Sequence, residues 1–321
     1  MIDNKENNID GDNIKRSSIW SYTPVMVATA IFCCVLWGSA SPAIKIAYEL
    51  FHIDASDTAS RLVLAGARFI IAGIMTIVFG SIVAKKVLIP KKESALYILI
   101  LALFQTIGQY YFFFMSLANT SGVRGSIINA AGNFLAPLLA VAIFRLEKFS
   151  VRKMIGCIIG FTGIIIFFGG GSVFTTGGPM TLRGEGAMVA AAMFFAVSGC
   201  CIKIFSKYEN PVVLSGYQFA LGGLVLFVIG QLMGGSLVFY STGCYMNLIY
   251  MGFISAGAYT MWGVLLKYNP VSKVSVLGFV NPIMGVLLSA LFLGEQNQAF
   301  SIISVVSLAL VSLGIIVVNK K

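Results

Sequence analysis

Charged side chains are scarce in this chain. Only 11% of its 321 residues are Asp, Glu, Lys or Arg, whereas a soluble domain averages about 25%. Loops long enough to form a soluble domain are also missing, apart from a polar tail over residues 1–21 that we expect to be disordered and cytoplasmic. These two absences exclude an ordinary soluble enzyme or binding domain.

Groups that carry catalysis are equally rare. The single histidine, His52, falls in a predicted loop, and the six cysteines include no CxxC pair. Neither an HExxH nor a GxSxG pattern occurs, and the glycines of residues 169–178 lack the Lys-Ser/Thr of a phosphate-binding loop. We therefore expect no metal, no cofactor and no disulfide framework. An intramembrane enzyme is the disfavoured alternative from another functional class.

Carboxylates are absent from the predicted membrane interior. All five aspartates precede residue 58, and the seven glutamates fall in tails, loops or helix ends. A proton relay at membrane depth normally needs Asp, Glu or His, because burial can move the pKa of these groups toward neutrality. The sequence thus predicts a protein that does not couple to protons through a mid-membrane carboxylate.

Hydrophobic residues, in contrast, make up 58% of the chain, and the mean hydropathy is +0.91. A hydrocarbon core about 30 Å thick requires about 20 apolar residues per helix. Ten windows meet that length, near residues 24–46, 62–84, 94–115, 124–144, 151–169, 185–205, 212–233, 245–266, 272–293 and 299–318. The first is similar to a signal peptide over 25–41, but Pro42 and the apolar residues after it favour an uncleaved helix. The composition predicts an all-α polytopic membrane protein with ten transmembrane helices.

Basic residues follow the positive-inside rule. With the N-terminus inside, 17 of the 22 Lys and Arg residues lie at inner ends and loops, four lie outside, and Arg68 lies within the second helix. This asymmetry predicts a multi-pass protein of the cytoplasmic cell membrane with both termini in the cytoplasm. The net charge of +10 then serves orientation and contact with anionic lipid. The expected partners are the lipid bilayer and a small-molecule substrate, and no nucleic acid.

The chain contains two related halves. A step of 148 residues takes Asn281 to Asn133 and Glu295 to Glu147, and residues 44–46 (Ile-Lys-Ile) correspond to residues 202–204. Five helices per half is an odd number, so the second half must insert upside down, as in many transporters. We therefore predict two inverted five-helix repeats, the first over residues 22–170 and the second over residues 184–321.

Several short motifs occur in a recognisable order: Trp37-Gly38 with Lys45, Arg68-Phe69, Glu147, Tyr259 with Trp262, and Pro282 followed by Glu295. In order and spacing they resemble the ten-helix EamA-type carriers of the drug/metabolite transporter superfamily. The resemblance implies that helices 1–4 and 6–9 surround a central cavity, with helices 5 and 10 outermost. One departure is Phe134, where the family has a proline beside Asn133. Because Pro137 comes three residues later, the bend in helix 4 is expected about a turn from its mate in helix 9.

Polar and aromatic side chains mark the expected cavity. Helices 5 and 10 carry no amide or charge through their cores, which suits lipid exposure or packing through the glycines of residues 156–160. Unpaired amides are costly in hydrocarbon, so those of the other helices must face the interior. The alternative for any one amide is a hydrogen bond that only joins helices. The predicted substrate-binding residues are Trp37, Gln105, Gln109, Tyr110, Asn129, Asn133, Gln218, Tyr259, Trp262 and Asn281.

Two kinds of residue have open roles. Arg68 either binds a substrate carboxylate or phosphate, or extends along its helix to bond backbone carbonyls. Glu147 and Glu295 are expected to cap the helix that follows each of them.

Helix breakers provide the expected hinges or gates, namely Gly38, Pro42, Pro137 and Pro282. A proline frees a backbone carbonyl and permits a bend. Residues 37–42 are expected to interrupt helix 1, and Pro137 and Pro282 to interrupt helices 4 and 9.

The function that fits these features is a membrane carrier. It would move a small metabolite, such as an amino acid or a related compound, outward by alternating access. A rival interpretation in the same class is a flippase for lipid or lipid-linked sugar, which would open its cavity sideways to the bilayer. A monomer and a homodimer fit the sequence equally well.

Overall fold

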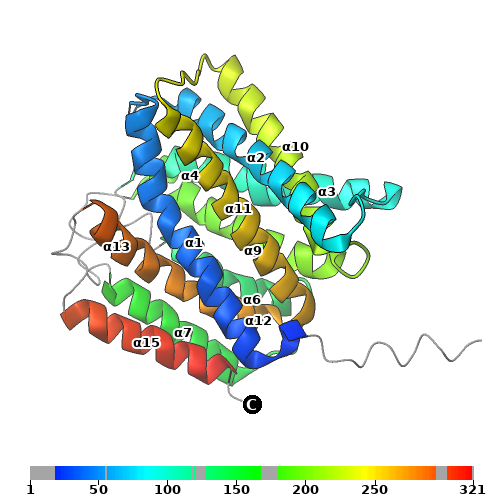
Figure 1. Ribbon diagram of the computed structural model, residues 1–321. Helices are drawn as coiled ribbons and strands as arrows, with labels where there is room; N and C mark the ends of the chain where they lie inside the picture. The colour runs from blue at the N-terminus through cyan, green and yellow to red at the C-terminus, as the bar shows by residue number, and fades with distance from the viewer. Residues whose placement is uncertain are drawn as a thin grey trace, which may run out of the picture.

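The computed structural model describes residues 19–54, 56–117, 119–120, 128–167, 180–293 and 302–319. Within them every regular element is a helix, and the helices form ten spans, which we number in chain order (Figure 1). Each predicted window overlaps one span, so the predicted fold class is confirmed. Spans 1, 2, 3, 6, 7 and 8 are each long and apolar enough to cross a membrane. Shorter helices form the others.

The first half contains spans 1 to 5. After a short helical turn, η2 (Ile19–Ser21), span 1 is α1 (Thr23–Leu50) and span 2 is α2 (Thr58–Ala84). Span 3 runs through η3 (Lys92–Ser94), α3 (Ala95–Leu101), the π-helix η4 (Ala102–Gly108) and α4 (Gln109–Leu117). Span 4 is α6 (Gly132–Ala142) with the helical residues 128–130 before it, and span 5 is α7 (Val151–Phe167).

The second half repeats this pattern. Span 6 combines the π-helix η5 (Leu182–Gly186) with α9 (Ala187–Phe205), and span 7 is α10 (Pro211–Leu232). Span 8 is α11 (Thr242–Tyr268). Span 9 runs through α12 (Val271–Ser275), the 3₁₀-helix η6 (Val276–Phe279) and α13 (Val280–Leu293), and span 10 is α15 (Ile302–Asn319).

The two halves join through a stripe of glycines between α2 and α10, which lie side by side in Figure 1. Gly66 and Gly73 of α2 face Gly223 and Gly216 of α10 so closely that no Cβ atom would fit on any of the four. Glycines recur every seven residues, at 66, 73 and 80 in the first half and at 216, 223 and 230 in the second. A step of 150 residues relates the two sets. Equivalent helices of the two repeats therefore form the seam between them, and we call this contact the glycine seam.

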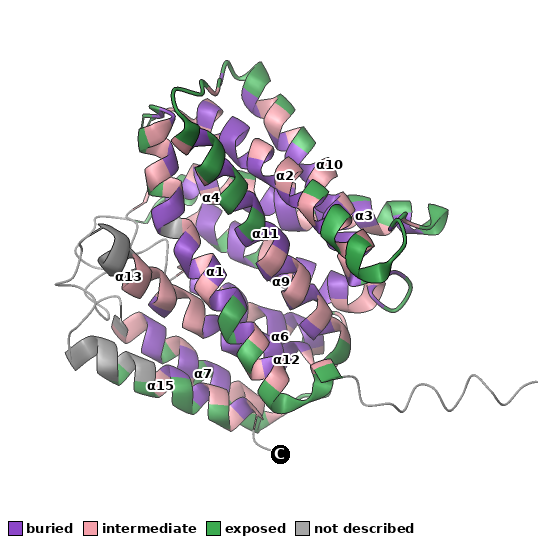
Figure 2. Ribbon diagram, viewed as in Figure 1, coloured by how far each residue is buried: buried purple, intermediate pink, exposed green. Residues whose placement is uncertain are grey.

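Spans 5 and 10 pack against each other at one edge of the bundle (Figure 1). A Cβ atom on Gly314 of α15 would lie 2.6 Å from the Gly156 carbonyl oxygen and 2.7 Å from the Gly160 nitrogen of α7. The predicted packing through the glycines of residues 156–160 is thus confirmed. Ile155 of α7 and Ile316 of α15 are exposed apolar residues, and Figure 2 shows exposed positions along α15 at this edge of the bundle. Such positions suit contact with lipid.

The predicted helix interruptions are partly wrong. α1 continues without a break through Pro42, which is buried inside it. Span 9 is interrupted as predicted, by η6, which ends three residues before Pro282. Span 4 is interrupted at Ala131, before Pro137, where the Phe134 amide bonds the Ala131 carbonyl in the 3₁₀ manner. A step of 148 residues takes Ala131 to Phe279, the last residue of η6. The two interruptions therefore lie at equivalent positions, not a turn apart.

Candidate functional site

Aromatic side chains meet where spans 1, 3 and 8 come together inside the bundle. The hydroxyl oxygens of Tyr110 and Tyr259 lie 3.0 Å apart and share a hydrogen bond. The Trp37 ring lies 5.0 Å from the rings of both Tyr259 and Trp262, measured between centroids. Phe69 adds a ring from span 2, at 4.6 Å from Tyr110. The structure thus brings together four of the predicted site residues, and we call these five side chains the aromatic cluster.

The two joined tyrosines are equivalent residues of the two halves. Residues 104–110 read Phe-Gln-Thr-Ile-Gly-Gln-Tyr and residues 253–259 read Phe-Ile-Ser-Ala-Gly-Ala-Tyr, so a step of 149 residues matches four positions closely. Phe69 and Phe219 are a second equivalent pair, and their rings stack with centroids 5.4 Å apart. The aromatic cluster therefore lies where the two repeats face each other.

Two of the predicted amides are occupied in joining spans 3 and 7. Gln218 accepts a hydrogen bond from the Thr106 hydroxyl at 2.8 Å and donates one to the Gln105 side-chain oxygen at 3.2 Å. Gln218 is completely buried and Gln105 nearly so. Both partners of Gln218 come from the π-helix η4, a form that is rare and is often found at functional sites. For Gln105 and Gln218 the geometry favours the alternative role of helix joining.

We expect Gln218→Leu to destabilise the protein. The change removes both hydrogen bonds and leaves the Thr106 and Gln105 groups buried without partners, at a cost of about 1 to 3 kcal/mol. Thermal unfolding of the purified protein in detergent would measure the loss. Gln231→Leu is the matched control, because Gln231 lies on the same helix and is exposed. If Gln218→Leu unfolds at the same temperature as Gln231→Leu, the structural role of this network is contradicted.

The other four predicted polar residues lie on spans 3, 4 and 9. Gln109 is buried in span 3, and its side-chain oxygen has no hydrogen-bond partner within the described residues. Asn133 is buried in span 4 against Gly278 of η6, where no Cβ atom would fit beside its amide. Asn129 and Asn281 are half-buried, close to the interruptions of spans 4 and 9. Gln109 and Asn133 are thus the two of these four residues that are buried.

The predicted hinge residues have different surroundings. Gly38 lets α1 approach α13, since a Cβ atom there would lie 2.8 Å from the Gly285 nitrogen. Pro42 lies within a continuous helix, as described above. Pro137 and Pro282 each lie within the first two turns after an interruption.

Arg68 is buried in α2 at 5% exposure, beside a small hollow between spans 1, 2, 3 and 8. Arg61, two helical turns earlier, and Tyr48 of α1 line the same hollow, and apolar residues such as Leu64, Phe114 and Met251 complete its walls. The hollow is small, with room for about one water molecule, and part of it is open to the outside. We call it the arginine hollow.

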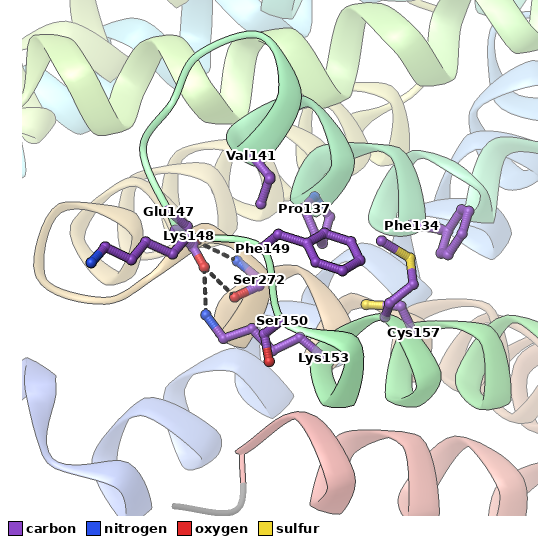
Figure 3. Close-up of a pocket in the computed structure, with 11 residues that line it drawn as sticks. Phe134, Pro137, Val141, Glu147, Lys148, Phe149, Ser150, Lys153, Cys157 and Ser272 are labelled. Atoms are coloured by element: carbon purple, nitrogen blue, oxygen red, sulfur yellow. Dashed lines mark hydrogen bonds and ion pairs between the residues drawn. The ribbon is translucent and has the colours of Figure 1, made fainter.

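Glu147 links the two halves at one end of the bundle (Figure 3). Its carboxylate accepts hydrogen bonds from the backbone nitrogen of Ser272 at 3.0 Å and from the Ser272 hydroxyl, and pairs with Lys153 at 2.7 Å. Burial alone would raise the pKa of Glu147, but these donors outweigh it and the pKa is lowered. The expected cap of α7, the helix that follows Glu147, is wrong: the carboxylate caps α12 instead and reaches α7 through the ion pair with Lys153. Glu295 lies outside the described residues.

Two features of this interior were missed in the sequence. Arg61 is one of the four basic residues that the charge count places outside, and its spacing of seven residues from Arg68 puts both on one face of a helix. The glycine seam was missed as well, although its glycines recur every seven residues with the same step of 150 between halves.

A family model described as the EamA-like transporter family matches residues 24–169 and again residues 182–320. The chain belongs to the EamA-like transporter family. Members are polytopic membrane proteins that transport small metabolites, which confirms the resemblance drawn from the motifs.

Relatives of this EamA-like protein include a WAT1-related chloroplast protein of Arabidopsis thaliana, 27% identical over 88% of this chain. The matched region spans 66% of the length of that plant protein. A protein of Salmonella typhimurium named a probable amino-acid metabolite efflux pump is 25% identical over 83% of this chain and 86% of its own. A crystal structure of an 18% identical protein covers 92% of this chain and 98% of its own with a TM-score of 0.71. That structural likeness shows the shared fold.

Proposed function

We propose that this EamA-like transporter exports an amino acid or a related small metabolite across the cytoplasmic membrane by alternating access. The observation that carries the proposal is the partly buried hydrogen bond between Tyr110 and Tyr259, equivalent residues of two inverted halves. A centre built from both halves can open to either side when the halves exchange conformations. The amino-acid class is suggested by the name of the Salmonella relative.

Movement between the two conformations requires flexible points, and the proposal assigns these to spans 4 and 9. The interruptions at Ala131 and η6 occupy equivalent positions, and Pro137 and Pro282 follow them. Each proline leaves a carbonyl one turn earlier without its helical partner. Residues 22–170 and 184–321 would then act as the two repeats that exchange roles. Asn133 and Asn281, which lie beside the interruptions, are proposed as substrate ligands together with Gln109, Asn129 and the aromatic cluster.

Counterflow in proteoliposomes tests the proposed activity. Vesicles that contain the protein and an excess of one unlabelled L-amino acid are expected to accumulate the labelled form of any transported member of a twenty-amino-acid panel. Because the sequence places no carboxylate at mid-membrane, we expect this exchange to proceed without an imposed pH gradient. Protein-free vesicles are the control. Lipid scrambling in place of amino-acid exchange would favour a flippase and overturn the proposal.

The proposed orientation, with both termini in the cytoplasm, can be tested by thiol labelling. All six native cysteines are buried, and replacing them gives a silent background. A cysteine at Thr176, in the predicted outer loop, is expected to react with an impermeant maleimide in whole cells, whereas one at Lys321 is expected to react only after the membrane is opened. The reverse pattern would contradict the topology inferred from the basic residues.

A further inference from the structure

Two guanidinium groups, those of Arg61 and Arg68, border the arginine hollow without hydrogen-bond partners. The side chains of Arg61 and Arg68 make no hydrogen bond or ion pair to any described residue, and the Nε atoms of both are buried without a partner. The buried hydroxyl of Tyr48 also has none. Asp57, the acid nearest to Arg61 along the chain, accepts a hydrogen bond from the Ser60 nitrogen; this bond and, to a smaller extent, the Arg61 charge lower the pKa of its carboxyl, but Asp57 forms no ion pair with Arg61. Three polar groups therefore border one hollow with their donors free.

Aromatic rings are the main contacts of the two cations. The Arg68 guanidinium carbon lies 4.6 Å from the Phe69 ring centroid and 5.1 Å from that of Tyr110, and Arg61 lies 4.7 Å from the ring of Tyr48. Cation–π contacts favour the charge but accept none of the five N–H donors of an arginine. A buried charge that served only the fold would normally be paired, because an unpaired one is costly.

The residue equivalent to Arg68 in the second half has a structural role, and its surroundings differ from those of Arg68. The step of 150 residues that relates the glycine seam takes Arg68 to Gln218. Both polar atoms of the Gln218 side chain are hydrogen-bonded, to Thr106 and Gln105 of span 3. The positions of span 8 that match Gln105 and Thr106 are Ile254 and Ser255, and the Ser255 hydroxyl bonds its own helix at Met251. Arg68 thus replaces an amide whose hydrogen bonds are made, and neither Ile254 nor Ser255 makes a hydrogen bond to it.

We propose that the arginine hollow is the subsite for the carboxylate of the transported molecule, with Arg68 as its main ligand. This inference rests on the proposed function and adds a substrate class to it. A guanidinium presents paired donors that match a carboxylate, and the Tyr48 hydroxyl is free to donate to the same group. Arg61 lies about 10 Å nearer the start of α2 and is half-buried, so it meets the anion before Arg68 does. Arg68 also contacts Tyr110, which places the remainder of the substrate against the aromatic cluster.

Binding to the full-length protein in neutral phosphatidylcholine nanodiscs tests the subsite without relying on transport. Isothermal titration with the twenty L-amino acids, and with the C-terminal amide of each that binds, compares ligands that differ in the carboxylate alone. We expect every amide to bind at least ten-fold more weakly than its acid. Arg68→Gln, which introduces the residue of the equivalent position, should weaken binding of the acid at least thirty-fold and should leave binding of the amide unchanged.

Further variants give graded expectations. Arg68→Lys keeps the charge but loses the paired donors, so an intermediate affinity is expected. Arg61→Gln should weaken binding about three- to ten-fold. Arg183→Gln is the matched control, because Arg183 is exposed on η5, and its binding should equal that of the unchanged protein.

The outcomes separate this inference from the proposed function. Acids and amides that bind equally, or acid binding that survives in Arg68→Gln, would overturn the subsite while leaving transport intact. No binding and no counterflow by any amino acid would overturn the proposed function as well. Binding of inorganic phosphate, or loss of amino-acid binding in nanodiscs that contain anionic phosphatidylglycerol, would assign the hollow to a phosphate group and overturn the carboxylate assignment. If Arg68→Gln does not fold, the comparison of acids with amides on the unchanged protein still tests whether the site binds the carboxylate.

Discussion

Gly66→Ala is expected to prevent stable assembly of the two halves. A Cβ atom at this position would lie 2.4 Å from the Phe227 nitrogen and 2.7 Å from the Gly223 carbonyl oxygen. Both are backbone atoms of α10, which cannot move aside as the end of a flexible side chain can. Overpacking of a close-packed interior costs about 1 to 3 kcal/mol, and a clash with backbone belongs at the upper end or beyond. We expect little folded protein, and an unfolding temperature far below that of the unchanged chain.

The control for this substitution is Gly199→Ala in α9. A Cβ atom there meets its nearest neighbour, a side-chain carbon of Leu266, at an ordinary 3.8 Å. Alanine is also the better helix former, so the control should fold at least as well as the unchanged protein. Fluorescence-detected size exclusion of tagged variants would measure folded yield and thermal stability together. Equal yields for the two alanine variants would contradict the close approach of α2 and α10.

The glycine seam also bears on how the repeats pair. Gly223→Ala is expected to fail for the same reason as Gly66→Ala, since its Cβ atom would lie 2.7 Å from the Ile70 nitrogen and 2.9 Å from the Gly66 carbonyl oxygen. The two substitutions act on one contact, so their effects should not add. The seam holds Phe69 against Phe219, and Arg68 and Gln218 directly precede these two residues in the chain. The packing of small residues thus fixes where the candidate site forms.

The fold could be predicted because a bilayer imposes the length of each apolar segment. All ten windows became helices, and the contact of α7 with α15 followed from glycine spacing. The break expected in helix 1 was wrong for a local reason. Pro42 is buried within α1, and a Cβ atom on Gly38 would lie 2.8 Å from the Gly285 nitrogen of α13, so a neighbouring helix packs closely against this segment and can hold it helical. A sequence shows where a helix can break, but its neighbours decide whether it does.

The candidate site could be predicted only in part. The sequence predicts that the amides and aromatic rings are buried, because exposing polar groups to lipid is costly. Which amide bonds which did not follow, because Gln105 and Gln218 lie 113 residues apart in the chain. The partner of Glu147 was wrong for the same reason, since Ser272 lies 125 residues away. The lack of hydrogen-bond partners at Arg61 and Arg68 could not be predicted either, because it depends on which residues of the neighbouring helices surround them.

The contact of Glu147 predicts a pH-dependent stability. Glu147→Gln is expected to destabilise the protein at neutral pH by about 1 to 3 kcal/mol, because the charge that pairs with Lys153 and caps α12 is lost. The side chain is only 8% exposed, so solvent screens the ion pair weakly. Thermal unfolding in detergent would measure the difference, with Glu93→Gln as the control at an exposed position.

The sign of the pH effect follows from the lowered pKa of Glu147. A carboxylate whose pKa is lower in the folded protein than its ordinary 4.5 contributes stability at higher pH, and that stability is lost as the pH falls through the folded pKa. The difference in unfolding temperature between the unchanged protein and Glu147→Gln should therefore be full at about pH 7 and should shrink below about pH 4.5. The glutamine variant has no such group, so it lacks this contribution throughout. A difference that stays constant across that range would show that the carboxylate charge does not stabilise this end of the bundle.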